Sequence, residues 1–390
     1  MKINYPTNIA KGYTYSFLSW FGITGLWVMY LQTKGLSLVE IGLCESIFHV
    51  ASFIFEVPSG VLADRFSYRF DLFWGRVAAI VSALIMLLGQ NFWLFAVGFV
   101  LNALSYNLQS GTIDALLYDS LIPAKLADKY PKVASNVDIV IEFADTAGIV
   151  IAGFLVHWYF ELTYVISIFA SFFGIITVLL FKEPRITKPK ATADQPTIKS
   201  IVTTSWQVLK HNHQLRNLML FDAFFASICT TYYYYFQSLM ETDSFSGWMI
   251  SALMILSALI NIAGIRVTPQ IQAHFSKRSL ILLLSLSLVV LLLLSWINST
   301  PLLVEVFLLS QLLGALITPI FSDYYNTMIA SEQRATLLSV ASVLFSMAMI
   351  VIFPAMGWLI QNHGFSAAFG LIGVGMLIIL VLMQKSFRTN

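Results

Sequence analysis

The chain has 390 residues, of which 58% are hydrophobic and only 11% are charged, with a net charge of +2 and a mean hydropathy of +0.79. A soluble globular domain carries about 25% charged residues, so this composition excludes the water-soluble classes of protein. Lipid offers the backbone no hydrogen bonds, and the apolar runs are too long for barrel strands, so we expect an all-α polytopic membrane protein.

The N-terminus shows no cleavable signal pattern, so the first span is expected to stay in the mature protein. Cys44 and Cys229 both fall inside apolar runs. Two such thiols are expected to be small core residues rather than a disulfide or a metal pair.

Twelve membrane spans are predicted in two groups of six. Their ranges are 12–33, 37–62, 71–90, 92–117, 133–156 and 162–181, then 213–238, 245–266, 279–297, 301–327, 336–360 and 366–384. The connection between the groups, residues 183–211, is rich in proline and basic residues and is predicted to be a cytoplasmic linker with a surface helix near 198–209. It separates an N-terminal bundle, residues 1–182, from a C-terminal bundle, residues 212–390.

Every lysine and arginine except Lys34 falls on one side of the membrane if the N-terminus is cytoplasmic. Because basic residues favour the cytoplasmic side, both termini are predicted to be cytoplasmic.

The two halves share short repeats. Tyr118–Ile122 returns 207 positions later as Tyr325–Ile329, and Phe66–Arg69 returns 209 positions later as Phe275–Arg278. Parallel repeats of this kind place a substrate site between the halves, near the middle of the membrane.

The segment Gly60-Val61-Leu62-Ala63-Asp64-Arg65-Phe66, followed by a basic Arg69, joins the second and third predicted spans. With these residues the chain resembles the major facilitator superfamily. Arg334–Ser339 looks like the start of the eleventh helix in drug-efflux relatives, and Ser110–Asp119 is similar to a branch of bacterial permeases. The resemblance implies a twelve-helix transporter of the bacterial plasma membrane, and it implies gating roles for a set of residues near the cytoplasmic ends. These are Gly60, Asp64, Arg65, Arg69, Asp119 and Arg334.

The sequence departs from the efflux members of this superfamily in two helices. Their fourth helix carries an arginine, whereas here the corresponding region has Tyr106, Gln109 and Gly111. Their glycine-rich motif in the fifth helix survives only as Gly148 and Gly153.

Ionisable residues inside a membrane span are costly, so each is a candidate for function. In the second span Glu45, His49, Ser52 and Glu56 follow a helical spacing that puts them on one stripe, able to pass protons. Glu45 could equally be solvated near the outer surface, and His49 could be a hydrogen-bonded core histidine.

The fifth span carries Asp138, Glu142 and Asp145 on one face. Three carboxylates this close cannot all be ionised in a low dielectric without cations, so Glu142 and Asp145 are candidates for proton coupling. Asp138 could be only a solvated helix end.

Arg76 is the basic residue well inside a span of the first half, and it is predicted to pair with Glu56, Asp114 or Glu142. The alternative is a fixed structural ion pair. Asp114, Asp222 and Asp323 complete the candidates for coupling, although Asp323 could also serve a gate.

Aromatic and amide side chains on the predicted cavity helices favour a bulky amphiphilic or cationic solute. The tyrosines at 232–235 could instead form an interfacial belt. The substrate-cavity candidates are Trp20, Trp27, Tyr30, Tyr106, Gln109, Tyr232, Gln237 and Gln311.

The sequence shows no nucleotide loop, metal cluster or nucleophilic triad, so we expect neither an enzyme nor a cofactor. The predicted function is proton-driven export of a lipophilic or amphiphilic small molecule, for which a cationic charge is one alternative. The alternatives are proton-coupled uptake of a polar metabolite or peptide-like solute, and a sensor or scaffold that does not transport. The expected partners are a small-molecule substrate, protons and the lipid bilayer, with no nucleic acid, and the chain is expected to act as a monomer.

Overall fold

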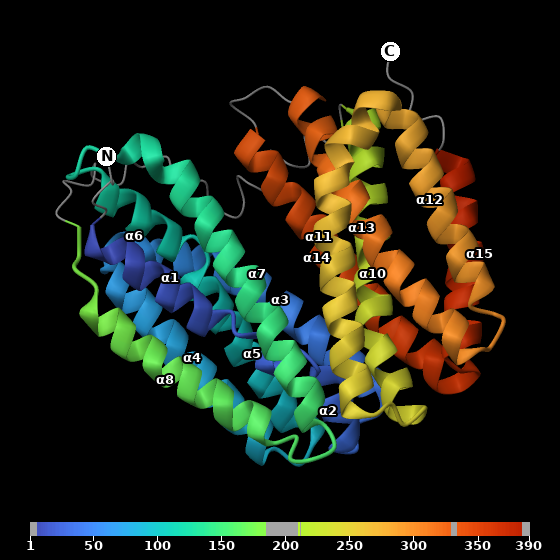
Figure 1. Ribbon diagram of the computed structural model, residues 1–390, viewed down its shortest axis with the longest axis horizontal. Helices are drawn as coiled ribbons and strands as arrows, with labels where there is room; N and C mark the ends of the chain where they lie inside the picture. The colour runs from blue at the N-terminus through green and yellow to red at the C-terminus, as the bar shows by residue number, and fades with distance from the viewer. Residues whose placement is uncertain (1–5, 185–209, 211, 329–333, 384–390) are drawn as a thin grey trace. The chain divides into compact units, whose positions relative to one another are not determined.

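A computed structural model describes residues 6–184, 210, 212–328 and 334–383, and these residues form helices and connections with no strand (Figure 1). The predicted linker helix near 198–209 lies outside the described residues. The α-helices are α1 Thr7–Ser19, α2 Trp27–Thr33, α3 Leu38–Arg65, α4 Tyr68–Leu88, α5 Phe92–Gln109, α6 Thr112–Leu121, α7 Tyr130–Leu155, α8 Leu162–Leu180, α10 His213–Thr242, α11 Gly247–His274, α12 Lys277–Leu294, α13 Thr300–Met328, α14 Arg334–His363 and α15 Phe365–Met383. Two short 3₁₀ helices are η1, Gly22–Thr24, and η2, Ala127–Lys129.

The all-helical membrane fold is confirmed. Nine segments of the described chain are long and apolar enough to cross a membrane, one of them being α5 and α6 taken together. The other three predicted spans coincide with α7, α10 and the broken segment from α1 to α2. Helix α7 contains three acidic residues and α10 contains four consecutive tyrosines, so both are less apolar than the nine segments. The count of twelve spans and the cytoplasmic position of the termini stay predictions.

The first predicted span is not one continuous helix. It divides into α1, η1 and α2, and η1 lies directly against α7. Gly148 of α7 is the point of closest approach, because a β-carbon there would overlap the backbone of Gly22 and Ile23. Glycine is what allows two backbones to come this close.

The fourth predicted span is also divided. Helix α5 ends at Gln109, and Gly111 has a φ of +74°, in the left-handed region that glycine adopts without strain. The chain then continues as α6. Neither division was predicted, since the apolar pattern continues through both.

The chain divides into two compact units. Unit 1 contains residues 1–30, 47–195 and 246–252, and unit 2 contains residues 31–46, 196–245 and 253–390. Helix α3 therefore contributes its first turns to unit 2 and the remainder to unit 1. The predicted bundles 1–182 and 212–390 stay a prediction.

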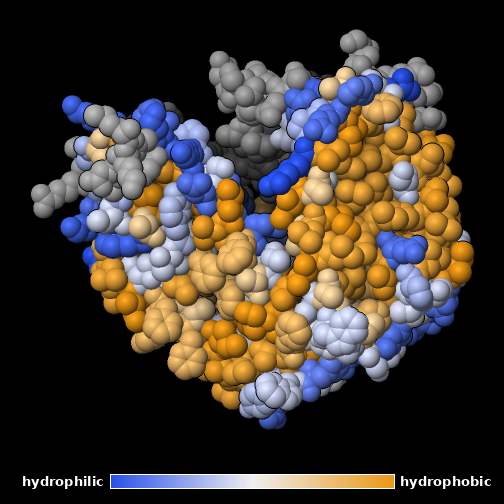
Figure 2. All heavy atoms as spheres, in the orientation of Figure 1, coloured by the Kyte–Doolittle hydropathy of each residue, from blue (hydrophilic) through white to orange (hydrophobic). Residues whose placement is uncertain are grey.

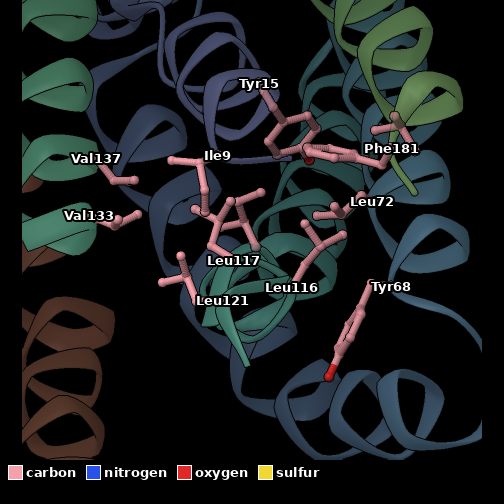
Figure 3. Packing of buried hydrophobic residues seen from close by; sticks show 12 residues of the cluster. Ile9, Tyr15, Tyr68, Leu72, Leu116, Leu117, Leu121, Val133, Val137 and Phe181 are labelled. Atoms are coloured by element: carbon pink, nitrogen blue, oxygen red, sulfur yellow. The ribbon is translucent and has the colours of Figure 1, made fainter. Parts of the chain in front are cut away.

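Figure 3 shows buried apolar side chains that pack together in unit 1. Ile9, Leu117 and Val133 come from three different helices and are almost completely buried. On the outside, large apolar side chains such as Leu283, Leu286 and Val290 of α12 are exposed. Figure 2 shows apolar atoms covering this outer surface, with hydrophilic atoms gathered toward the helix ends. An apolar surface of this extent is what contact with lipid requires.

The sequence repeat between the two halves is matched in the structure at the start of α4 and at the start of α12. Ser67 accepts a hydrogen bond from the backbone N–H of Phe70 at the start of α4, and Ser276 accepts one from Ser279 at the start of α12. The two serines lie 209 positions apart, at the repeat offset. Each satisfies a backbone donor that the first turn of a helix leaves unpaired.

The contact between η1 and α7 gives a test of stability. Gly148→Ala is expected to lower the free energy of unfolding by about 1–3 kcal/mol, because the added methyl group forces two backbones apart. Thermal unfolding of the purified protein in detergent measures this change. Gly375→Ala is the matched control, since a β-carbon there meets nothing within 4 Å. Equal stability of the two variants would contradict the close packing of η1 on α7.

Candidate functional site

Arg76 is at the centre of a buried polar cluster in unit 1. Its side chain is 3% exposed, and one terminal nitrogen donates to Gln109 Oε1 at 2.8 Å and to Ser105 Oγ at 3.3 Å. The Tyr15 hydroxyl also donates to Gln109 Oε1, at 3.4 Å, and the guanidinium lies 5.8 Å from the centre of the Tyr15 ring. The cluster therefore joins α1, α4 and α5 through one buried cation.

The predicted carboxylate partners of Arg76 are not the groups that it contacts. Glu56, Asp114 and Glu142 form no ion pair with it in the described part of the chain. The predicted ion pair is replaced by neutral oxygens and an aromatic face. Gln109, predicted to line the cavity, instead orients Arg76 from within the bundle.

Asp145 and Glu142 are exposed on one face of α7. Asp145 lies against the break in the first span, where a β-carbon at Gly22 would overlap its carboxylate and backbone. Asp138 is also exposed, one turn further toward the start of the helix. A carboxylate exposed on a membrane helix needs water rather than lipid, so this face of α7 requires an aqueous path.

An aromatic group lies in the same unit. The Trp20 ring meets the Tyr106 ring edge-on at 5.9 Å, and Tyr106 in turn meets Phe48 at 6.2 Å. Tyr106 is exposed, and Trp20 and Phe48 are half-buried. These three rings form a surface that an aromatic or cationic solute can contact. Trp27 is half-buried and packs on Phe99, at 5.3 Å.

The polar residues of α3 that were predicted to form one stripe differ in how deeply they are buried. His49 is buried, with its ring edge-on to Phe48, whereas Glu56 is exposed and Glu45 is half-buried in the part of α3 that belongs to unit 2. Ser52 exchanges two hydrogen bonds with Asn107 of α5, at 3.2 and 2.7 Å. One member of the predicted stripe thus holds two helices together.

Three predicted cavity residues lie in the cores of the two units. The Tyr30 hydroxyl donates to the Met86 carbonyl at 3.1 Å, and the Tyr232 hydroxyl donates to the Leu303 carbonyl at 3.2 Å. Tyr232 and Gln237 are completely buried, and the Tyr232 ring packs against three phenylalanines. Tyr232 and Tyr235 are completely buried and so cannot belong to the interfacial belt predicted for the tyrosines at 232–235. Gln311 is half-buried on α13.

The gate candidates that the structure describes connect helices at one end of unit 1. The Tyr68 hydroxyl donates to the gate candidate Asp119, at Oδ2, over 2.6 Å. Asp114, a candidate for proton coupling on the same helix, accepts a hydrogen bond at Oδ1 from the Tyr130 hydroxyl at 3.4 Å. Arg69 donates to the Leu179 carbonyl, in the last turn of α8, at 2.9 Å. Gly60, Asp64 and Arg65 are in the last turns of α3 and Arg334 begins α14, but their side chains lie outside the described residues.

The end of α8 has further partners. Lys11 donates to the Leu180 carbonyl, and Asn8 exchanges two hydrogen bonds with the backbone of Lys182, at 2.7 and 3.0 Å. Together with Arg69 these side chains satisfy carbonyls that a helix end leaves unpaired, and the two cations complement its dipole.

In unit 2, both predicted acids have partners. The Tyr325 hydroxyl donates to Asp222 Oδ2 at 2.7 Å, and Lys277 forms an ion pair with Asp323 at 2.6 Å. Lys277 and Tyr68 occupy equivalent repeat positions. Tyr68 joins the start of α4 to Asp119 near the end of α6, and Lys277 joins the start of α12 to Asp323 near the end of α13.

Comparison with known proteins decides the family. The family model for the Major Facilitator Superfamily matches residues 10–325. The chain belongs to the Major Facilitator Superfamily. It is therefore a multi-pass membrane transporter and not an enzyme.

Individual relatives of this transporter are distant. It is 23% identical over 372 residues to the uncharacterized MFS-type transporter YxaM of Bacillus subtilis (strain 168), covering 92% of this chain and 90% of that protein. A crystallised mutant of the nucleoside transporter NupG is similar with a TM-score of 0.80 at 15% identity, covering 98% of this chain and 100% of that one. The D-xylose-proton symporter has a TM-score of 0.66 at 13% identity, covering 95% and 96% of the two chains. At these identities the two solved structures show the fold alone.

Sequence reasoning missed two members of the buried polar set of this transporter. Asp71, in the first turn of α4, is completely buried, although the predicted span began at that residue and so treated it as a helix end. Tyr15 is not among the predicted site residues, although it contacts both Gln109 and Arg76. An acidic residue directly at the start of an apolar run was the available signal, because a charge buried in a membrane is costly and is a candidate for function.

The Arg76 cluster gives a second test. Arg76→Lys is expected to lower the free energy of unfolding by about 1–3 kcal/mol, because an ammonium group cannot reproduce the planar guanidinium contacts with Gln109, Ser105 and Tyr15. Thermal unfolding in detergent measures it, with Arg69→Lys as control, since that arginine donates one exposed hydrogen bond. Gln109→Glu should keep the stability, as it adds a charge complementary to Arg76. Unchanged stability of Arg76→Lys would contradict the described role.

Proposed function

We propose that this transporter exports a lipophilic or amphiphilic, cationic small molecule in exchange for protons, by alternating access. The observation that carries the proposal is the exposed pair Glu142 and Asp145 on α7, in the same unit as the partly exposed rings of Trp20, Tyr106 and Phe48. Carboxylates attract both a cation and a proton, and aromatic faces favour a lipophilic cation. The same site then serves substrate and proton in turn.

The proposed cycle uses competition at these carboxylates. Substrate binds from the cytoplasm while Glu142 and Asp145 carry negative charge. Protons arriving from outside neutralise the pair, weaken the attraction for the cation and release it. The membrane potential contributes about 2.3 kcal/mol per charge per 100 mV to this exchange, in addition to the pH gradient.

Proton-coupled uptake of a polar solute is the second candidate. The fold neighbours favour it, because their names describe a nucleoside transporter and a D-xylose-proton symporter. The Arg76 cluster also supports it, since a buried cation held by neutral oxygens can balance a protonation change elsewhere in the unit.

Reconstituted vesicles distinguish the two directions. With an imposed pH gradient, export predicts that the lipophilic cation tetraphenylphosphonium moves against the proton flux, whereas uptake predicts that a nucleoside or D-xylose moves with it. A growth-inhibition panel gives a second readout, because export predicts resistance of expressing cells to lipophilic cations. Movement of the polar solute with protons, together with no movement of the cation, would contradict the export proposal.

The coupling residues give a third test. Glu142→Gln with Asp145→Asn is expected to reduce transport driven by the pH gradient at least about ten-fold, a change of about 1.4 kcal/mol, because the neutral side chains cannot exchange protons. Exchange of labelled for unlabelled substrate without a gradient should need a higher substrate concentration and should no longer depend on pH, because the neutral pair attracts the cation less and cannot be protonated. Glu305→Gln, an exposed acid of α13 outside the site, is the matched control. Gradient-driven transport at the wild-type rate in the double variant would remove the pair from the mechanism.

Glu56 tests the other predicted proton path. It is exposed near the end of α3, beyond the buried His49. If the stripe on α3 carries protons, Glu56→Gln alone should lower gradient-driven transport while leaving gradient-free exchange unchanged. If Glu56→Gln matches the wild type in both assays, the α7 pair alone accounts for coupling.

The wider setting of this function is proposed on the same basis. The chain is placed in the plasma membrane of a bacterium, in line with its Bacillus relative. It acts as a monomer, with a small-molecule substrate and protons as partners and with no cofactor beyond the proton gradient.

A further inference from the structure

The break between α1 and η1 leaves backbone carbonyls without donors. Helix α1 ends at Ser19, and the backbone N–H of Trp20 donates to the Ser16 carbonyl at 3.0 Å. In the described part of the chain, no N–H or O–H group donates to the carbonyls of Phe17, Leu18 or Ser19. The last carbonyls of a helix point along its axis, so these three face the gap between α1 and η1.

This gap lies inside the first predicted membrane span, where a carbonyl without a donor is costly. Irregular backbone at such a depth is tolerated where it lines a water-filled cavity. The negative end of the α1 dipole also favours a positive charge at the same place. A ligand that carries both a positive charge and N–H donors meets the two requirements together.

Asp145 of α7 supplies a carboxylate at the same break. Gly22 begins η1, and a β-carbon at Gly22 would overlap Oδ1 of Asp145. The Asp145 side chain is exposed, and within the described residues no lysine, arginine or histidine forms an ion pair with it. A negative charge without a cationic partner therefore lies directly beside the unpaired carbonyls.

Aromatic rings border the gap. The Trp20 ring meets the Tyr106 ring of α5 at 5.9 Å, and the Phe17 ring meets the exposed Phe143 ring of α7 at 6.4 Å. Two residues of chain span at most about 7 Å, so Trp20 and the contact of Gly22 with Asp145 belong to one small area. Aromatic faces attract an organic cation with a lipophilic body, which a bare metal ion lacks.

We propose that the gap between α1 and η1 binds the protonated amine group of the substrate. The Asp145 carboxylate balances its charge, a carbonyl at the end of α1 accepts its N–H, and Trp20 and Tyr106 contact its ring system. The inference rests on the proposed function, because it specifies which cation the Glu142 and Asp145 site binds.

The site should select protonated amines against cations that have no N–H group. A quaternary ammonium or phosphonium ion meets the carboxylate and the rings but leaves the carbonyls of α1 unpaired. Tetraphenylphosphonium therefore still binds, but more weakly than an amine of similar size. This selection is opposite to the order that lipophilicity and ease of desolvation alone would give.

A matched pair of ligands tests the selection. Dimethyl(naphthylmethyl)amine, which is protonated near neutral pH, and trimethyl(naphthylmethyl)ammonium carry the same charge and ring system, but only the first has an N–H. Titration calorimetry of the wild-type protein in lipid nanodiscs measures both, and empty nanodiscs correct for partition into lipid. We expect the amine to bind about ten-fold more tightly, the factor that the loss of one charged hydrogen bond gives. Equal or tighter binding of the quaternary ion would overturn the proposal.

Variants test where the amine binds. Asp145→Asn should weaken both ligands at least about ten-fold, because the opposing charge is lost. Asp138→Asn is the matched control, since Asp138 is also exposed on α7 but lies about 10 Å further toward the start of the helix. Trp20→Leu should weaken both ligands and keep their ratio. Unchanged affinity in Asp145→Asn, or an equal loss in Asp138→Asn, would contradict the assigned place.

Photo-crosslinking locates the ligand in the wild-type protein and so does not depend on the folding of a variant. A diazirine derivative of the naphthyl amine should label residues within 17–25 or 142–149, as read by mass spectrometry of the digested protein. Labelling confined to other segments would overturn the proposal.

These results are distinguishable from those of the transport assays. Tight binding of the amine at the gap, without proton-driven export, would support the site and contradict the export. Proton-driven export of cations by a protein that binds the quaternary ion as tightly as the amine would do the reverse.

Discussion

A backbone carbonyl or N–H inside a membrane must find its partner within the protein, and most of the structure described above follows from this constraint. The described chain departs from regular helical hydrogen bonding at several places, among them η1, Gly111 and Pro354 inside α14. Two of these breaks lie beside polar side chains from other helices. Asp145 lies against Gly22 of η1, and Ser46 donates to the carbonyl that Pro354 leaves without a donor. Breaks in the helices and buried polar residues therefore occur together.

The same constraint explains how Arg76 is tolerated. A buried cation is expensive, and the partners found in the described residues are amide, hydroxyl and aromatic groups rather than carboxylates. Glu142 and Asp145, which are exposed on α7, are therefore not the partners that hold this cation in the described part of the chain.

The sequence was sufficient for the all-helical fold and for the family, because long apolar runs and the Gly60–Phe66 motif are local signals. Predicted span limits agree with most helix ends to within a few residues. The breaks at Gly22 and Gly111 were not predictable, since a glycine in an apolar run looks the same whether it bends the chain or packs in a helix. Helical spacing placed Glu142 and Asp145 correctly on one face. It could not place Tyr232 or Gln237, because whether one face of a helix meets a cavity or a neighbouring helix depends on tertiary packing.

The hydrogen bonds at the end of α8 have a mechanical consequence. Lys11, Arg69 and Asn8 hold the last carbonyls of this helix, and the backbone N–H of Tyr68 donates to Glu183, just after it. Any tension that the chain beyond Glu183 applies is thus carried by α1 and α4 together, and not by α8 alone. A force applied at this point would therefore move α1, α4 and α8 together rather than unwind the end of α8.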